Sequence, residues 1–240
     1  MDARTLSRKG AAYCLVAGPA LFALSALFSV STEEEVADYL ADVSGATGRH
    51  VFSGALFMLG GFALLIGMLG VAHLLRARRL TLGQVAAWMV ALGATIGVGV
   101  FVIGVFDAEA AEVATDRVAM VELLERAEDS VGANVFFIVL FALGILLGNL
   151  LLALALLRRR AAGIPVWVPG VIVAGLILSF VFGDGILGAL AFLVLAAGYW
   201  GIAGRMLAVS DEEWERWSPL GEAAARPDEV APPAAPTASA

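Results

Sequence analysis

The chain has 240 residues, of which 60% are hydrophobic and only 15% are charged. Soluble domains have about 45–50% apolar and about 25% charged residues, so this composition excludes a disordered chain, a collagen and a small disulfide scaffold. Together with a mean hydropathy of +0.90, it indicates an integral membrane protein. The net charge of −7 excludes the clustered basic surface of a nucleic-acid-binding protein.

Six apolar stretches are long enough, or nearly long enough, to cross a bilayer as a helix, which takes about 20 residues. They cover residues 11–30, 51–75, 83–106, 134–157, 166–182 and 186–203. The fifth and sixth stretches are short and are separated only by Gly183-Asp184-Gly185, a sequence typical of a tight turn. We therefore predict an all-α fold, a polytopic membrane bundle of six transmembrane helices within residues 1–209.

The Lys and Arg residues predict the orientation of these helices. All but three of the 15 lie before span one, between spans two and three, between spans four and five, or after span six. Cytoplasmic loops are rich in Lys and Arg, so we predict that both termini are cytoplasmic and that the protein lies in a bacterial plasma (inner) membrane. Trp88, Trp167 and Trp200 fall near the same helix ends, at the depth that interfacial tryptophans prefer.

Two long outer loops are predicted to contain short amphipathic helices. In the first loop, before span two, Val36, Leu40 and Val43 mark one apolar helical face. In the second loop, before span four, Glu122 and Arg126 have the spacing of an i,i+4 pair. Both loops are acidic, and we expect them to pack on the bundle as lids. The alternative is an acidic surface that attracts cations or a basic partner.

The chain also repeats part of its sequence. The pattern that starts at His50 and ends at Gly60 recurs, at a constant offset, between Asn134 and Gly144. Each copy follows an acidic outer loop and ends in a cluster of arginines. This arrangement predicts a parallel repeat of helical hairpins.

The C-terminal residues differ from the rest of the chain. Trp214 and Trp217 lie three residues apart, on one face of a short interfacial helix predicted over residues 210–218. Residues 219–240 are rich in Ala, Pro and Glu and have too little apolar surface to fold. We predict that this segment is a disordered cytoplasmic tail.

Few side chains are suited to chemistry. The chain has no catalytic or phosphate-binding motif, and Cys14, His50 and His73 are too few for a metal site built from cysteine or histidine. We therefore expect no catalytic residue, no metal and no cofactor. Asn149 is the one strongly polar residue expected at mid-membrane depth. Its ordinary role is an interhelical hydrogen bond, and the alternative is a contact to a ligand.

Four polar residues are expected at the same depth, near the outer ends of the helices. They are His50, Asp107, Asn134 and Asp184. If they converge, they form a shallow, outward-facing polar pocket, in which an imidazole between carboxylates suits a proton switch or a cation site. The alternative is that they are ordinary capping and turn residues.

Small and hydroxylated residues inside the spans predict packing rather than chemistry. Gly93 and Gly97 form a GxxxG pair, whose usual role is the close approach of two helices. Ser25, Thr95 and Ser179 are expected to bond to carbonyl groups of their own helices.

The order of these segments resembles that of a known group of proteins. Span one, an acidic outer helix and a second span with a basic end are followed by Ile164-Pro165-x-Trp167-x-Pro169-Gly170-x-x-x-Ala174-Gly175. Together they resemble uncharacterised bacterial six-helix integral membrane proteins, grouped as a domain of unknown function, although Pro169 is an extra residue in the motif. The resemblance covers residues 8–207 and implies a six-helix bundle. It implies no activity and no catalytic residue.

These features together favour a non-enzymatic membrane protein, either a scaffold or a partner-binding or regulatory subunit, because buried charge is scarce. The alternative is a small transporter or lipophile-binding bundle built from parallel hairpin repeats, which the repeat and Asn149 favour. A third hypothesis is a membrane enzyme that uses His50, Asp107 and Asp184. The expected partners are the lipid bilayer and a protein, either a different subunit or a second copy, but no nucleic acid.

Reporter fusions test the predicted topology. Because of the distribution of basic residues, fusions after Arg79, Arg160 and Arg205 should read as cytoplasmic, and fusions near Asp42 and Asp116 as external. The activities of one reporter that works only outside the cytoplasm and one that works only inside it give the side of each site. A single reversed site would contradict the six-span arrangement.

Overall fold

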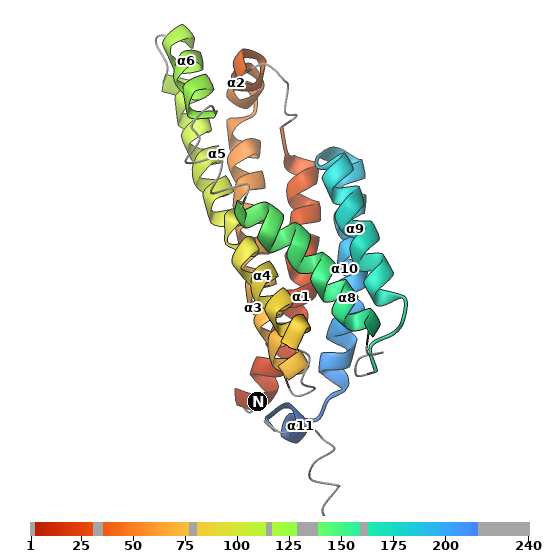
Figure 1. The fold of residues 1–240 in the computed structure, drawn as a ribbon. Coiled ribbons are helices and arrows are strands. Elements are labelled where there is room, and N and C mark those ends of the chain that lie inside the picture. Colours follow the sequence, from red (N-terminus) through yellow and green to blue (C-terminus); the bar gives the residue numbers. More distant parts are fainter. Residues whose placement is uncertain are drawn as a thin grey trace, which may run out of the picture.

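The structure, a computed structural model, describes residues 3–30, 36–76, 81–113, 117–128, 139–158 and 163–215. These residues form helices and contain no strand, so the all-α prediction is confirmed for them. The helices pack into an elongated bundle (Figure 1). We call the end with the N-terminal residues and α11 (Asp211–Glu215) the terminal end. The opposite end, with α2 (Val36–Gly45) and α6 (Arg117–Glu128), is the distal end.

Four helical segments are long and apolar enough to cross a membrane, which indicates a membrane protein. They are Thr5–Phe28, Thr47–Arg76, Thr81–Glu109 and Gly185–Ala208, and they match predicted spans one, two, three and six. The helices that contain them are α1 (Ala3–Phe28), α3 (Thr47–Arg76), α4 (Thr81–Ala94) with α5 (Ile96–Val113), and α10 (Gly185–Ala208).

Within the described residues, the apolar helices of the fourth and fifth predicted spans are shorter, Leu143–Arg158 and Val168–Phe182, so six spans are not confirmed. The described part of span four is the π-helix η1 (Leu140–Leu147) followed by α8 (Gly148–Arg158), and it runs obliquely across the bundle (Figure 1). Residues 134–138 lie outside the described residues. Span five is α9 (Val168–Phe182), which begins late because Pro169 occupies its first turn, where proline is favoured.

The predicted tight turn between the last two helices is present. α9 ends at Phe182 and α10 begins at Gly185, which has a φ of +67°. Glycine adopts this left-handed conformation without steric cost, so the turn needs only Gly183 and Asp184 between the two helices.

The helices form a closed ring in which each contacts the next. α1 packs against both α3 and α10, α3 packs against α4 and α5, and α4 packs against η1 and α8. α8 in turn contacts α9, and α9 contacts α10, which closes the ring. The large apolar side chains buried between these helices include Leu15, Leu64, Met68, Leu152, Ile172, Ile202 and Met206.

Glycines set the closest approaches within this ring. A Cβ added at Gly67 of α3 would collide with the backbone of Leu15 on α1. A Cβ at Gly97 would lie 3.1 Å from the carbonyl oxygen of Phe57 on α3, and one at Gly93 would lie 2.8 Å from the backbone nitrogen of Ile145 on η1. The GxxxG prediction is confirmed, and its two glycines contact different helices.

The proposed sequence repeat has a counterpart in these contacts. Gly60 and Gly144 occupy equivalent positions in the two copies. A Cβ at Gly60 would lie 2.9 Å from the carbonyl oxygen of Gly18 on α1, and one at Gly144 would lie 2.5 Å from the Cα of Gly93 on α4. Each repeated glycine therefore packs on a glycine of the preceding span, which favours the repeat.

The loop helices and the tryptophans follow the sequence pattern. Leu40 and Val43 of α2 are buried, so α2 packs on the distal end as a lid. α6 carries the predicted ion pair of Glu122 and Arg126, with a nitrogen–oxygen distance of 3.3 Å. At the terminal end three tryptophans lie on the outer surface and are each more than half exposed: Trp88, Trp167 and Trp200.

α11 closes the terminal end through polar contacts to α1 and α10. Asp211 accepts hydrogen bonds from Thr5 Oγ1 at 2.6 Å and from Arg8 Nε at 2.9 Å. Arg8 is buried and also donates to the backbone oxygens of Met206 and Leu207, at 3.1 and 2.8 Å. The hydrogen bonds from Thr5 and Arg8 lower the pKa of Asp211 below its usual value of 3.8.

A second contact holds α11 from the side of α3. His73 Nε2 donates to the backbone oxygen of Trp214 at 2.6 Å, and the two rings pack with their centroids 4.5 Å apart. Trp214 is buried, so this tryptophan of the predicted interfacial helix packs on the bundle. Trp217 lies outside the described residues.

Replacement of Gly67 by leucine should destabilise the bundle. The side chain would meet the backbone of α1, which cannot move aside as a flexible side chain can, so the cost should reach at least about 1–3 kcal/mol. A lower Tm in detergent measures it. Gly204→Leu is the matched control, because a Cβ at Gly204 has no atom within 4 Å. Equal losses of Tm in the two variants would contradict this account.

The contact of α11 should weaken in acid. Because the folded protein stabilises the carboxylate of Asp211, this stabilisation is complete at neutral pH and is lost as the pH falls through the lowered pKa, below 3.8. In a variant that keeps Trp214 as its only tryptophan, the emission should shift to longer wavelength in that range. With Asp211→Asn added to this variant, the emission should already lie at longer wavelength at neutral pH. Acid should then cause no further shift. An acid-induced shift of the emission that persists in Asp211→Asn would contradict this assignment.

Candidate functional site

Two partly open cavities between the helices, of about 290 and 300 Å³, are lined by most of the polar residues that the sequence singled out. Each is about as large as the smallest ligand pockets in proteins, which start at roughly 300 Å³. The first, the apolar chamber, lies in the middle of the helix ring and is lined by Phe22, Phe57, Leu64, Ala94, Ile96, Val100, Phe141, Ile145, Leu146, Asn149, Leu176, Ser179, Phe180, Phe192, Leu195 and Tyr199. The second, the polar chamber, lies toward the distal end and is lined by Ser25, Ser29, Val30, Tyr39, His50, Ser53, Gly54, Phe57, Val100, Ile103, Gly104, Asp107 and Asp184.

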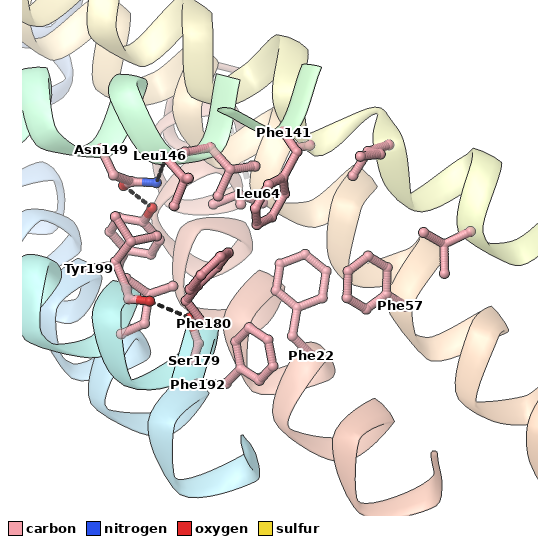
Figure 2. A pocket seen from close by; sticks show the side chains of 16 residues that line it. Phe22, Phe57, Leu64, Phe141, Leu146, Asn149, Ser179, Phe180, Phe192 and Tyr199 are labelled. Atoms are coloured by element: carbon pink, nitrogen blue, oxygen red, sulfur yellow. Dashed lines mark hydrogen bonds between the residues drawn. The ribbon is translucent and has the colours of Figure 1, made fainter. Parts of the chain in front are cut away.

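Aromatic rings form much of the wall of the apolar chamber (Figure 2). Phe22 of α1 packs on Phe57 of α3 and on Phe192 of α10, with centroid distances of 4.6 and 5.6 Å. Phe141 of η1 stacks on Phe180 of α9 at 6.1 Å. These rings come from five helices, so the chamber exists only when the ring of helices is closed.

Asn149 and Tyr199 are the buried polar pair of the apolar chamber. The hydroxyl of Tyr199, on α10, donates to Asn149 Oδ1 at 2.5 Å, and Asn149 Nδ2 donates to the carbonyl oxygen of Ile145 at 2.8 Å. The interhelical hydrogen bond expected for Asn149 is therefore present. Ser179 Oγ, the third polar group of this lining, donates to Leu176 of its own helix at 2.9 Å. Because each of these side chains already has a partner within the protein, the chamber suits an apolar occupant.

The π-helix η1 shapes one wall of the apolar chamber. Its turns are wider than those of an α-helix, and such turns often occur at functional sites. Phe141, Ile145 and Leu146 of η1 line the chamber, and Asn149 follows directly at the start of α8. The wide turns and Asn149 therefore belong to the same wall.

One side of the apolar chamber is also part of the outer surface of the bundle. Phe180 of α9 lines the chamber, and its exposed fraction is 65%. Phe180 therefore belongs both to the wall of the chamber and to the surface that the hydrocarbon of a bilayer would cover.

The polar chamber brings together three of the four residues predicted for an outer pocket. His50, Asp107 and Asp184 all line it, and Asn134 lies outside the described residues. Tyr39 of α2 joins them: its hydroxyl donates to Asp107 Oδ2 at 2.9 Å and lies 3.4 Å from His50 Nε2.

Asp107 and His50 are held close by the local packing of α3 and α5. The exposed fraction of Asp107 is only 6%, and its second carboxylate oxygen has no hydrogen-bond partner among the described residues. A Cβ added at Gly104, one turn before Asp107, would lie 3.3 Å from His50 Nε2, so glycine at this position leaves room for the imidazole. No group of three or more His, Cys, Asp and Glu residues that could hold a metal ion occurs in the described part of the chain.

Tyr39 is the residue of this site that sequence reasoning missed. It lies directly before Leu40, three residues after Val36 and four before Val43, so the apolar period of the lid helix already pointed to its position. Because tyrosine has a polar hydroxyl group, the pattern did not predict that this ring is half-buried between α3 and α5. Tyr39 thus connects the lid helix to both residues of the predicted pair.

Ser25 differs from its predicted role. Instead of bonding to its own helix, Ser25 Oγ donates to the carbonyl oxygen of Ser53 on α3 at 2.9 Å, and Ser53 Oγ donates back to the carbonyl oxygen of Ser25 at 2.9 Å. The prediction is wrong because α1 and α3 approach so closely here that the neighbouring carbonyl is within reach. Thr95 and Ser179 do bond to their own helices, as expected.

Comparison of the chain with protein-family models, with curated proteins and with solved structures gives no significant match. The resemblance to uncharacterised bacterial six-helix membrane proteins therefore stays a prediction.

Proposed function

We propose that this protein binds a lipophilic small molecule inside its helix bundle, in the apolar chamber. The observation that supports the proposal is a cavity of about 290 Å³ whose wall is almost entirely apolar, with six aromatic rings, and whose polar side chains already have partners within the protein. An apolar occupant leaves all of these hydrogen bonds intact. A strongly polar occupant would have to give up its hydration without gaining equivalent partners.

The physical basis of binding inside a membrane favours a particular kind of ligand. A lipophile that leaves the bilayer gains no hydrophobic free energy, because lipid tails are as apolar as the chamber. Affinity must therefore come from closer van der Waals contact and from the faces of the aromatic rings. Phe22, Phe57 and Phe180 offer such contacts, so rigid, unsaturated or aromatic groups should bind better than a flexible saturated chain.

Phe180 supports a route from the bilayer into the apolar chamber. Its ring lines the chamber and is also largely exposed on the outer surface. A rotation of this one side chain opens a lateral path, and exposed side chains change rotamer within picoseconds to nanoseconds. Entry from the hydrocarbon phase then requires no passage through water.

The lipophile-binding alternative fits the geometry better than the scaffold or regulatory subunit that the sequence favoured. The apolar chamber offers a place for such a ligand, because its wall is almost entirely apolar and its polar side chains already have partners within the protein. In this proposal the protein lies in a bacterial plasma membrane with its terminal end in the cytoplasm. The distribution of Lys and Arg and the exposed Trp88, Trp167 and Trp200 support that orientation.

Photolabelling tests the proposal. A small apolar probe, an aryl diazirine with no charged group, should label residues of the apolar chamber in the protein reconstituted in nanodiscs. Ser179→Phe fills the chamber and should reduce this labelling by about tenfold or more, since a loss of about 1.4 kcal/mol suffices. Mass spectrometry of the labelled peptides measures the change.

Ile177→Phe is the matched control, because Ile177 lies on the same helix, does not line the chamber and is 56% exposed. It should leave the labelling of the chamber unchanged. Labelling confined to exposed side chains, or equal in the parent and in Ser179→Phe, would overturn the proposal.

A further inference from the structure

The two chambers share part of their walls. Phe57 of α3 and Val100 of α5 line both the apolar and the polar chamber. Figure 2 shows Phe57 beside Phe22, on the opposite side of the apolar chamber from Asn149 and Tyr199. The polar groups of the second chamber therefore begin where the aromatic wall of the first one ends.

From this arrangement we infer that the two chambers form one site for an amphiphile with a cationic, amine head group. The head group lies among Tyr39, His50, Asp107 and Asp184, and the apolar part extends past Phe57 into the apolar chamber. This inference rests on the proposed function, and it adds the chemical class of the ligand.

The charges of the polar chamber select a cation. Asp107 and Asp184 contribute carboxylates, and among the residues that line the chamber the one basic side chain is His50, with no Lys or Arg. Asp107 is buried, and only one of its oxygens receives a hydrogen bond among the described residues. A buried carboxylate without a cation is costly, so an ammonium group within hydrogen-bond distance would remove that cost. A phosphate or carboxylate head group would instead add a like charge.

The hydroxyl groups of the polar chamber can complete the coordination of an ammonium group. Ser25, Ser29 and Tyr39 each line the chamber, and their oxygens can accept hydrogen bonds while their own protons are donated elsewhere. An ammonium carries up to three donors, which matches one carboxylate and neighbouring hydroxyl oxygens. A neutral head group gains the hydroxyl contacts but no ion pair with Asp107.

The polar chamber and the apolar chamber follow each other along the bundle as the head and the apolar part of an amphiphile do in a membrane. The polar chamber lies at the distal end, under α2, and the apolar chamber lies deeper, in the middle of the ring. A molecule of the adjacent leaflet already has its head at this level and its apolar part below it. It therefore enters past Phe180 without turning over.

The size of the chambers limits the ligand to a compact or single-chain molecule. Each chamber is near the lower limit of about 300 Å³ for ligand pockets, so a phospholipid with two acyl chains would not fit. The inferred class is thus an amphiphilic amine with one chain or one rigid apolar group.

Competition against the diazirine probe tests the inference. Dodecylamine, dodecanol and dodecyl phosphate have the same chain and differ in charge at the head. In the parent protein, dodecylamine should suppress the labelling of the apolar chamber at a concentration at least about tenfold lower than dodecanol, and dodecyl phosphate should be the weakest. Equal competition by the three would overturn the inference.

Two variants locate the cause of the preference for an amine. Asp107→Asn should remove most of the advantage of dodecylamine over dodecanol while competition by dodecanol is retained, which also shows that the variant folds. If Asp107→Asn does not fold, Asp184→Asn gives the second measurement, since Asp184 lines the same chamber from an exposed turn. Asp38→Asn is the control: it removes one exposed charge from the lid helix and should change nothing.

The outcomes separate this inference from the proposed function. If dodecanol and dodecylamine compete equally and Asp107→Asn changes neither, binding in the apolar chamber stands and the cationic head group is wrong. If Asp38→Asn reduces the preference as much as Asp107→Asn, the general surface charge explains it and the inference is also wrong. If no probe labels the chamber in the parent protein, the proposed function falls together with the inference.

Discussion

The close contact of helix backbones at glycines is the constraint on which the rest of this structure depends. α3 is central to it, because Gly60 and Gly67 of this helix meet α1, and Gly61 meets the carbonyl oxygen of Ala94 at the end of α4. Contacts of this kind need residues without a side chain, and they fix both the spacing and the rotation of the helices. Toward the distal end, Phe57 of α3 lines both chambers, and Ser53 and Gly54 line the polar chamber.

The position of Phe57 on α3 links packing to the candidate site. A ring of helices can collapse onto its centre unless something holds its members apart. Phe22 packs on Phe57 and on Phe192 in that position, and the hydrogen bond between Asn149 and Tyr199 joins α8 to α10 on the other side. The cavity is thus bounded by packed aromatic rings at one side and by a buried polar contact at the other.

Much of the fold could be predicted from the sequence, because the strongest signals are local. Long apolar runs predicted the helices, and Gly183 and Gly185 predicted the turn. The alternation of basic and acidic loops predicted the level of each residue along the bundle. Depth alone placed His50, Asp107 and Asp184 at one level, and the structure brings these three to one cavity. The role of Tyr39, the wide turns of η1 and the oblique path of α8 could not be predicted in this way, because they depend on which helices become neighbours.

The buried guanidinium of Arg8 has a consequence for the order in which the molecule is assembled. Its hydrogen-bond acceptors are the carboxylate of Asp211 and the backbone oxygens of Met206 and Leu207, close to two hundred residues later in the chain. During synthesis the ribosome makes α1 first, whereas these acceptors emerge only after α10 is complete. Until then Arg8 must keep its charge in water or among lipid head groups. The final position of the first helix is therefore secured by the last part of the bundle to be made, so an unfinished chain cannot close the ring.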